Sequence, residues 1–437
     1  MHIVKNYDEL NISSERKIVL DLIETALESI QPENVFKNNV KLNGNILSIK
    51  GKTYNLGDYN RIFLLGFGKG SAENSKIIEA MLSDKLTAGY VIDLPATANG
   101  ALQAGTQEEE FSKIQFTLGT HPIISEENIE FTEKVMRNFT GLAERDLVIV
   151  VVCGGGSAMF EHPHSITLAQ KIQIEKALLK SGADITEINT IRQHLSDVKG
   201  GGLSKIMYPA KIVTLIFSDV PGNDLRFIAS GPTVKNDTTI DDALDIIKKY
   251  SLEKDINLPR EAFIDNPHDD KYFENIENFI VLSNVTVLDA IENKAKLLGL
   301  SVIRYSDRLK GDTKDVAKEL LENSKDKSLL IAAGETTVKV TGNGKGGRNQ
   351  QLALEALKIL NDNTYFASVD SDGWDFTDTA GAIVDIKSKQ KAEELNLNID
   401  DYLLNNDSYT FFQKINSQVI TGRLSSNVSD FMIVLKT

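Results

Sequence analysis

Hydrophobic residues along the chain follow first a helical and then a strand-like spacing. Residues 14–30 carry apolar side chains on one helical face, among them Ile18, Leu22 and Leu27, which predicts an amphipathic helix. Turn signals at 43–44 and 51–52 then predict a short hairpin. Farther along, runs that are apolar at every position predict strands buried on both faces. These runs are RIFLLG (61–66), AGYVIDL (88–94), DLVIVVVCG (146–154), AKIVTLIFSDV (210–220), FIVLSN (279–284), LSVIRYS (300–306), SLLIAAG (328–334), TYFASVDSDG (364–373) and FMIVLK (431–436).

Helical segments separate most of these strands. They lie at 71–82, 165–181, 286–298, 312–323 and 348–360. Buried strands that alternate with helices are typical of parallel α/β sheets whose two faces are covered. The polar stretch 251–278 is the weakest candidate for a packed core and indicates a domain boundary near it. We therefore predict an α/β protein of two domains, residues 1–240 and 241–424, with a final segment, 425–437, that can return to the first domain.

The composition narrows the class of protein. The 437 residues include 48 basic and 62 acidic ones, a formal net charge of −14, which disfavours binding along a nucleic-acid backbone but allows a local pocket for a small anion. The single cysteine, Cys153, excludes an intrachain disulfide and a thiolate-based metal site. The N-terminus lacks a signal-peptide pattern, and the longest apolar run, 147–153, is far shorter than the ~20 residues of a transmembrane helix. We expect a cytoplasmic protein without nucleic-acid or membrane partners, as a monomer or a homodimer.

Glycine-rich loops follow two predicted strands of the N-terminal half. Gly66-Phe67-Gly68-Lys69-Gly70-Ser71 opens the helix at 71–82, and its glycines let the backbone approach a ligand while the lysine adds positive charge. It is not a Walker A loop, which would need glycine where Phe63 stands. Cys153-Gly154-Gly155-Gly156-Ser157 offers successive amides that can form an anion-binding nest. Either loop could also be an ordinary turn.

Two further segments of this half carry charged candidates. Within 185–206, Arg192 and Lys199 suit an anionic ligand, whereas His194 is more typical of a hydrogen-bonded structural histidine. Asp219 ends the strand at 210–220, where a carboxylate is costly unless it binds metal, accepts a proton or is hydrogen-bonded.

The C-terminal half repeats this arrangement of glycines and charges at strand ends. Gly334-Glu335 ends one strand, and a glycine-rich turn then leads to Arg348-Asn349 at the start of a helix, which suits a planar contact to phosphate or carboxylate. Asp370 and Asp372 end the next strand; such carboxylates suit Mg²⁺, or they form Asx turns that cap the following helix. Anion-binding loops, cationic side chains and ligands for a hard metal together favour phosphoryl transfer.

Several longer motifs lie in order along nearly the whole chain. They are GFGKGSA (66–72), THPIISEEN (120–128), VVCGGGSAMF (151–160), INTIRQHLSDVKGGGLS (188–204), SDVPGNDLRFIASGPTV (218–234), GETTVKVTGNGKGGRNQQLALEA (334–356) and DSDGWDFTDTAGAIVD (370–385). With these motifs the chain resembles the type-2 glycerate kinase family, also called the MOFRL family. It departs from the family pattern at Asn223, at Phe376 and in the segment 421–430.

The resemblance implies ATP-dependent phosphorylation of D-glycerate with Mg²⁺, usually at the 2-hydroxyl to give 2-phosphoglycerate. It also implies an N-terminal Rossmann-like domain, a second α/β domain and an active site in the cleft between them. Lys69 and Arg348 match the lysine and arginine of the family's glycine motifs, so we predict them as catalytic, with Asp219 as base or, with Asp372, as metal ligand. The residues predicted to bind glycerate or nucleotide are Gly68, Gly154, Gly155, Gly156, Ser157, Arg192, Lys199, Gly334, Glu335 and Asn349.

Two other functions compete with the kinase. A dinucleotide-dependent oxidoreductase such as a hydroxypyruvate reductase would use the glycines at 66, 68 and 70, with Asp93 as the ribose-binding acid, although a lysine occupies that loop. A non-enzymatic sugar-phosphate-binding module would need no catalytic group. No helix-turn-helix pattern or basic face in the sequence supports a regulator of that kind.

Overall fold

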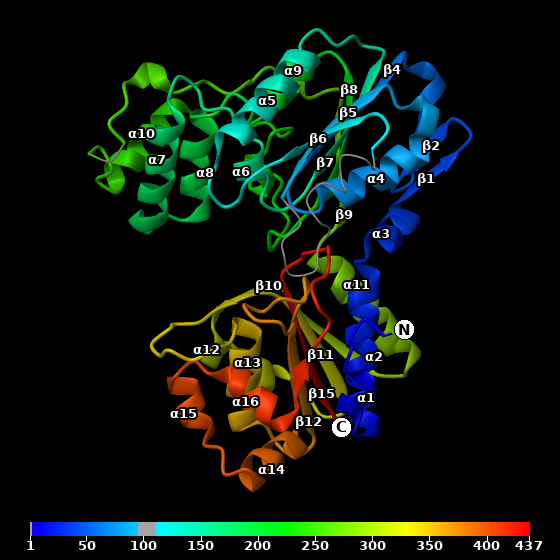
Figure 1. The fold of residues 1–437 in the computed structure, drawn as a ribbon, viewed down its shortest axis with the longest axis vertical. Coiled ribbons are helices and arrows are strands. Elements are labelled where there is room, and N and C mark those ends of the chain that lie inside the picture. Colours follow the sequence, from blue (N-terminus) through cyan, green and yellow to red (C-terminus); the bar gives the residue numbers. More distant parts are fainter. Residues whose placement is uncertain (1, 95–110, 255) are drawn as a thin grey trace. The chain divides into compact units, whose positions relative to one another are not determined.

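The computed structural model describes residues 2–94, 111–254 and 256–437. The chain divides into two compact units, one formed by Met1–Val35 with Leu282–Thr437 and the other by Phe36–Val281 (Figure 1). The predicted boundary between residues 240 and 241 is therefore wrong. The polar stretch after it leads into the strand β9 (Ile276–Leu282), which adds to the edge of the same sheet as the preceding strands.

The unit Phe36–Val281 is built on a six-stranded sheet with the order β6-β5-β4-β7-β8-β9. Adjacent strands pair in parallel from β6 through β8, and the runs apolar on both faces predicted this pairing for β4, β5, β7 and β8. This order is that of a Rossmann-like sheet, in which the chain leaves the centre in both directions from a switch point between β4 and β7. Besides β9, the strands are β4 (Arg61–Phe67), β5 (Ala88–Asp93), β6 (Ile114–Leu118), β7 (Asp146–Val152) and β8 (Lys211–Phe217).

Helices complete this unit. Those at α5 and α9 pack on one face of the sheet through Phe131, Val135 and Leu203, while α4 contacts β4, β5 and β7. A separate helical group, α7, α8 and α10, has its own apolar core around Leu178, Ile191 and Ile247. The bounds are α3 (Pro32–Asn39), β1 (Val40–Asn43), β2 (Ile46–Ile49), β3 (Lys52–Asn55), α4 (Ser71–Leu82), α5 (Glu126–Phe139), α6 (Gly156–Met159), α7 (Leu168–Ser181), α8 (Ile185–His194), α9 (Gly202–Met207) and α10 (Ile240–Lys249).

The other unit holds a mixed six-stranded sheet with the order β10-β11-β15-β12-β13-β14. Only β10 and β11 pair in parallel within it, because the C-terminal strand β15 lies antiparallel between β11 and β12. The expectation that 425–437 can return to the first domain is thus wrong, and so is the expectation of a parallel second sheet. The strands are β10 (Ser301–Asp312), β11 (Ser328–Thr337), β12 (Thr364–Asp370), β13 (Gly381–Val384), β14 (Gln418–Val419) and β15 (Asp430–Lys436).

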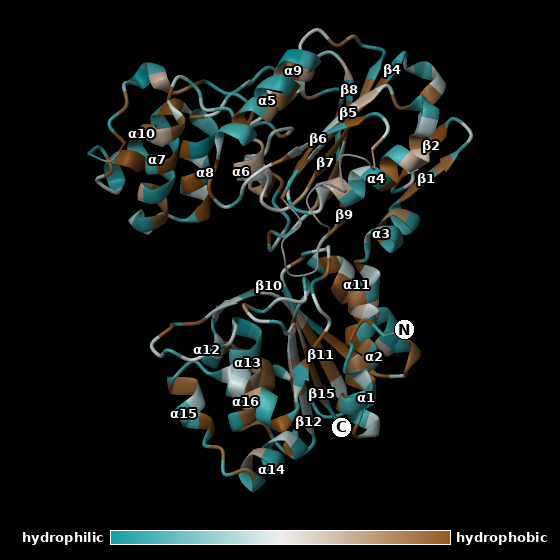
Figure 2. Ribbon diagram, viewed as in Figure 1, coloured by the Kyte–Doolittle hydropathy of each residue, from teal (hydrophilic) through white to brown (hydrophobic). Residues whose placement is uncertain are grey.

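Helices cover both faces of this mixed sheet, whose strands are largely hydrophobic in Figure 2. On one face α12, α13 and α16 bury a core that includes Leu320, Leu352 and Phe412. On the other face α11 and the N-terminal helix α2 contact β11, β12 and β15. No helix in the described ranges is long and apolar enough to cross a membrane. The helices are α1 (Tyr7–Leu10), α2 (Ser14–Ser29), α11 (Asn284–Leu297), α12 (Thr313–Asn323), α13 (Arg348–Ile359), α14 (Ile386–Glu394), α15 (Ile399–Leu404) and α16 (Ser408–Ile415).

A buried ion pair joins the N-terminal helix to the C-terminal part of this unit. The guanidinium of Arg16 on α2 donates to both carboxylate oxygens of Asp385, at 2.7 and 3.2 Å, and to the hydroxyl of Ser388 at 2.5 Å. Both charged side chains are almost fully buried, at 2% and 1% exposure. Removing one partner of such a pair leaves the other charge buried without compensation.

We predict that Arg16→Met lowers the free energy of unfolding of this unit by about 3 kcal/mol or more, because Asp385 stays buried without its cation. The measurement is urea unfolding, with hydrogen exchange in β15 to assign the loss to this unit. Lys17→Met is the matched control, since Lys17 pairs with Asp21 at the surface and should change the unfolding curve little. Equal stability of the two variants would contradict the prediction.

Candidate functional site

The two glycine-rich loops of the unit Phe36–Val281 form one structure at the switch point of its sheet. The amide of Lys69, after β4, donates to the carbonyl of Gly154, after β7, at 2.8 Å. Gly68 has a φ of 105°, and a Cβ built there would lie 2.4 Å from the carbonyl oxygen of Cys153. Only glycine fits this contact, so the loops meet through their backbones. The parallel pairing of β4 with β7 brings both loops to the same edge of the sheet.

The N-terminus of α4 is already capped from within the protein. The carboxylate of Asp93 accepts hydrogen bonds from the amides of Gly70, at 3.2 Å, Ala72, at 2.9 Å, and Leu94, at 2.7 Å. Burial, working against these hydrogen bonds, raises the pKa of Asp93 to about 6. Asp93 therefore occupies the amides that a dinucleotide pyrophosphate would use, and its own oxygens are engaged instead of facing a ribose.

His121 and Asp219 flank the second glycine loop. A Cβ on Gly155 would lie 3.0 Å from His121 Cδ2 and 3.4 Å from the Cε atom of Lys69, so the three residues adjoin one another. A Cβ on Gly154 would lie 2.2 Å from the carboxylate of Asp219. Burial, together with the charge of Lys69, lowers the pKa of His121 to about 4, so the imidazole is neutral at pH 7. His121 was not among the predicted site residues, although it lies within one of the recognised motifs.

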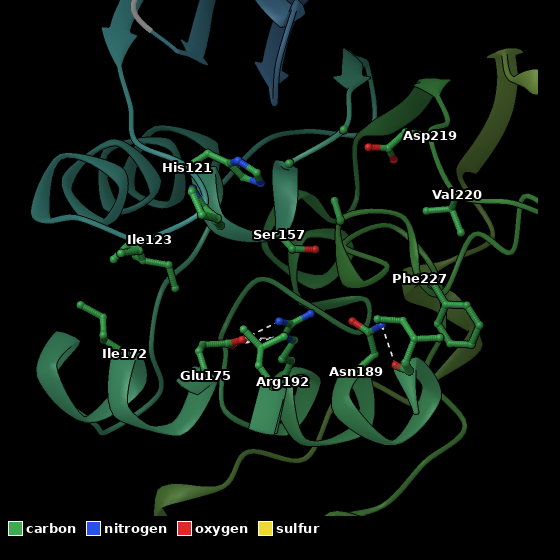
Figure 3. Close-up of a pocket in the computed structure, with 18 of the residues that line it drawn as sticks. His121, Ile123, Ser157, Ile172, Glu175, Asn189, Arg192, Asp219, Val220 and Phe227 are labelled. Atoms are coloured by element: carbon green, nitrogen blue, oxygen red, sulfur yellow. Dashed lines mark hydrogen bonds and ion pairs between the residues drawn. The ribbon is translucent and has the colours of Figure 1, made fainter. Parts of the chain in front are cut away.

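A cavity of about 400 Å³ opens beside these residues (Figure 3). Five of the predicted residues line it: Gly154, Gly155, Ser157, Arg192 and Asp219. The guanidinium of Arg192 is held by the carboxylate of Glu175, with Nε at 2.9 Å and Nη2 at 2.6 Å from the same oxygen. The predicted Arg192 thus reaches the cavity, but as a member of an ion pair.

Ser157 is oriented by a hydrogen-bonded chain. Ser230 donates its hydroxyl hydrogen to the side-chain oxygen of Asn189 at 2.7 Å, so Ser157, 3.2 Å from Ser230, is the donor to it. The backbone at Ala229 and Ser230 is left-handed, with φ of 50° and 60°. Such conformations cost about 1–3 kcal/mol each in non-glycine residues and persist where surrounding structure enforces them. The amide of Gly200 contributes to this enforcement by donating to the carbonyl of Ser230 at 3.1 Å.

A buried network of charges lies behind Arg192. Glu161 binds the ammonium groups of both Lys199 and Lys171, the second at 3.1 Å, and Lys171 lies 3.8 Å from Glu175. Burial lowers the pKa of Lys199 to about 8, whereas the two lysines, against the effect of burial, lower the pKa of Glu161 to about 2. Lys199, predicted to bind a ligand, has a side chain that is 1% exposed and pairs with Glu161.

The other unit holds a cluster of carboxylates around Arg348. Pairing of β11, β15 and β12 places Gly334 opposite Asp430 and Asp430 opposite Asp370. Arg348, at the start of α13, binds both oxygens of Asp430 at 2.6 and 3.0 Å, contacts Glu335, and lies 3.7 Å from Asp370. Burial raises the pKa of both aspartates, and the charge of Asp430 adds to the effect at Asp370. Sequence reasoning missed Asp430, which lies in the divergent segment 421–430.

The other predicted residues of this unit differ in their exposure to solvent and in their contacts. Asn349, predicted to bind a ligand, is fully buried and donates to Asp430 at 2.9 Å. Glu335 is half exposed, while a Cβ on Gly334 would lie 2.1 Å from the carbonyl of Leu309, so this glycine serves strand packing. Asp372 accepts from the amide of Trp374 at 2.9 Å, the Asx-turn alternative raised for this loop.

Comparisons with known proteins give matches over nearly the whole chain. The MOFRL family model matches residues 328–430, and a model described as a domain of unknown function, DUF4147, matches residues 18–262. The glycerate 2-kinase of Picrophilus torridus is 33% identical over 444 residues, covering 99% of this chain and 99% of its own. The chain belongs to the type-2 glycerate kinase family.

Among other relatives, one has a solved structure and another is named as a different enzyme. The crystal structure of the Thermotoga maritima glycerate kinase matches with a TM-score of 0.83 at 30% identity, covering 97% of this chain and 100% of that one. A protein of Agrobacterium vitis, provisionally named a hydroxypyruvate reductase, is 34% identical over 397 residues, covering 86% of this chain and 99% of its own. The two α/β units expected from the family resemblance are confirmed.

The family resemblance implies Mg²⁺, for which hard oxygen donors are needed. In the described ranges, no group of three or more His, Cys, Asp or Glu side chains is arranged to hold a metal ion. Mg²⁺ is nevertheless usually held by only one or two carboxylates, completed by waters and substrate phosphates. Asp219, a partly exposed carboxylate at the edge of the cavity, fits that mode of binding.

We predict that Glu161→Gln destabilises the protein by about 3–5 kcal/mol, because it leaves two buried ammonium groups without their shared carboxylate. Lys199→Met should cost much less, since Glu161 keeps Lys171. The folded pKa of Lys199, about 8, lies below its unfolded value, so the unfolded state binds more protons between the two. The stability of the wild type relative to Lys199→Met should therefore rise from pH 8 toward pH 10 in urea titrations. A pH-independent difference would contradict the assigned network.

Proposed function

We propose that this protein is a kinase that transfers the γ-phosphoryl group of ATP to D-glycerate. The names of the relatives support the reaction, and one structural observation supports the type of ligand. The buried network at the cavity carries three positive side chains, Lys171, Lys199 and Arg192, against two carboxylates, Glu161 and Glu175. Lys69 adds a further cation beside Gly155. An anionic ligand balances this charge, in a chain that is otherwise strongly acidic.

Residues at the cavity then have distinct roles in the proposal. Arg192, held in place by Glu175, binds a carboxylate or phosphate, and the loop from Gly154 to Ser157 binds the anion through its backbone and hydroxyl groups. Asp219 would hold Mg²⁺, with Asp372 as a second candidate ligand, and the metal when bound would neutralise charge that develops on the phosphoryl oxygens. With Asp219 on the metal, the neutral imidazole of His121 is free to accept a hydrogen bond from substrate.

We further propose that the phosphoryl group is transferred to the 2-hydroxyl, giving 2-phosphoglycerate, because the Picrophilus torridus relative is named a glycerate 2-kinase. We predict that phosphorus NMR of the reaction mixture shows 2-phosphoglycerate as the first product. The time course is followed from the earliest turnovers without auxiliary enzymes. A spectrum that contains 3-phosphoglycerate alone would exclude the 2-hydroxyl as acceptor.

We also propose that Lys69 and Arg348, which belong to different units, act on the same transferring phosphoryl group. Opposing charges hold Arg348 in a fixed orientation through Asp430, so its guanidinium is preorganised for such a contact. The cationic groups of Lys69 and Arg348 would stabilise the transferring phosphoryl group more than the ground state, so removing either should lower mainly kcat.

We predict that Lys69→Ala and Arg348→Ala each lower kcat by about 10³-fold while the protein still unfolds cooperatively. The double variant should be scarcely slower than either single variant, because the two residues act as one unit. Steady-state ADP release measures all three, and Lys205→Ala, a change at an exposed lysine of α9, is the control. Losses that multiply in the double variant would mean independent action and would overturn the shared-phosphoryl model.

Reduction of hydroxypyruvate is the second candidate, because one relative carries that name. The capping of α4 by Asp93 disfavours it, since the dinucleotide would have to displace a buried internal carboxylate. ADP release with glycerate and NADH oxidation with hydroxypyruvate, measured on the same preparation, separate the two reactions. Turnover in either assay also excludes a purely ligand-binding module.

A further inference from the structure

Helix α7 carries apolar residues on two faces. Ile174 and Leu178 pack into the core shared with α8 and α10. Ile172 and Leu179, seven residues apart, instead line the cavity, with Glu175 between them on the same face. Ile172 and Leu179 do not belong to that core, so packing within it does not explain why this face of α7 is apolar.

Aliphatic side chains from two other elements extend this face around the mouth of the cavity. Ile123 precedes α5, and Ile185 opens α8. The exposed fractions of Ile123, Leu179 and Ile185 are 57%, 71% and 53%, high values for large aliphatic side chains. We call Ile123, Ile172, Leu179 and Ile185 the apolar rim. Exposed apolar groups gathered at one pocket mark a binding site more often than scattered ones do.

Aliphatic side chains gather on one side of the cavity, whereas Val220 and Phe227 lie on the other side near Asp219 (Figure 3). In Figure 3, Ile123 and Ile172 lie together on one side, and Ser157 with the Glu175–Arg192 pair lies next to them. The cavity volume of about 400 Å³ falls in the range of roughly 300–1,000 Å³ that holds drug-sized ligands. Glycerate is a small polar acid that neither fills such a volume nor offers apolar surface to the rim.

We propose that the apolar rim is the subsite for the purine base of the nucleotide. The proposal rests on the proposed kinase function, which requires a ligand with a flat, largely apolar base at one end and several negative charges at the other. The rim matches the base, while Arg192, Ser157 and the neighbouring Lys69 match the phosphates. The base packs between Ile123 and the α7 side chains Ile172 and Leu179, and its binding covers their exposed surface.

The test compares ADP with pyrophosphate, which has the charges without the base. Isothermal titration measures both ligands on the full-length protein and on the double variant Ile123→Ser/Leu179→Ser. Serine removes apolar surface without adding a charge that would repel phosphate, and both positions are exposed, so folding is not at risk. Leu297→Ser, at an 85% exposed leucine of the other unit, is the matched control.

ADP should bind the double variant at least tenfold more weakly than the wild type, with pyrophosphate binding unchanged and the control like the wild type. Unchanged ADP affinity, equal weakening of both ligands, or failure of the wild type to bind ADP would each overturn the purine subsite. The binding measurement does not depend on turnover. If ADP binding depends on the rim while glycerate is not phosphorylated, the subsite stands and the proposed acceptor is wrong.

Discussion

The contact between the backbones after β4 and β7 is the constraint around which the site is built. Lys69 donates to Gly154 across the switch point of the sheet, and Gly68 lies against the carbonyl of Cys153 with no room for a side chain. Because the loops touch directly, the lysine side chain and the second glycine loop reach the same space. His121 and Asp219 then approach the loop closely where it too is glycine. Side chains on these loops would push the functional groups apart.

Local sequence patterns predicted most helices and strands. The features that they did not predict depend on pairing between distant segments and on the burial of single side chains. The strand at 431–436 is where its apolar run predicted, but its partners are β11 and β12, which only tertiary structure selects. Short or partly polar strands such as β6 and β14 left no pattern to recognise. Within the candidate site, Arg192 and Lys199 are both cationic residues of the segment 185–206, and the sequence gives no reason to distinguish them. One faces the cavity and the other is buried on Glu161, a carboxylate without any local signal.

The two units differ in the balance of charge within their clusters of ionic side chains. Around the cavity of the Rossmann-like unit, buried cations outnumber their carboxylates. Around Arg348 the balance is reversed, because Asp430, Asp370 and Glu335 surround one guanidinium. Protonation of the buried aspartates reduces that excess of negative charge, consistent with their raised pKa values.

The position of Cys153 gives the protein an internal reporter. It is the only thiol in the chain, and it lies buried directly beneath the junction of the two glycine loops, where the side-chain amide of Asn74 approaches its sulfur at 3.7 Å. Burial raises the pKa of the thiol, so it is unreactive in the closed structure. Alkylation of Cys153 therefore requires an opening of the structure that exposes the thiol. Thiol labelling of the wild-type protein can therefore report such openings around the two glycine loops without an introduced probe.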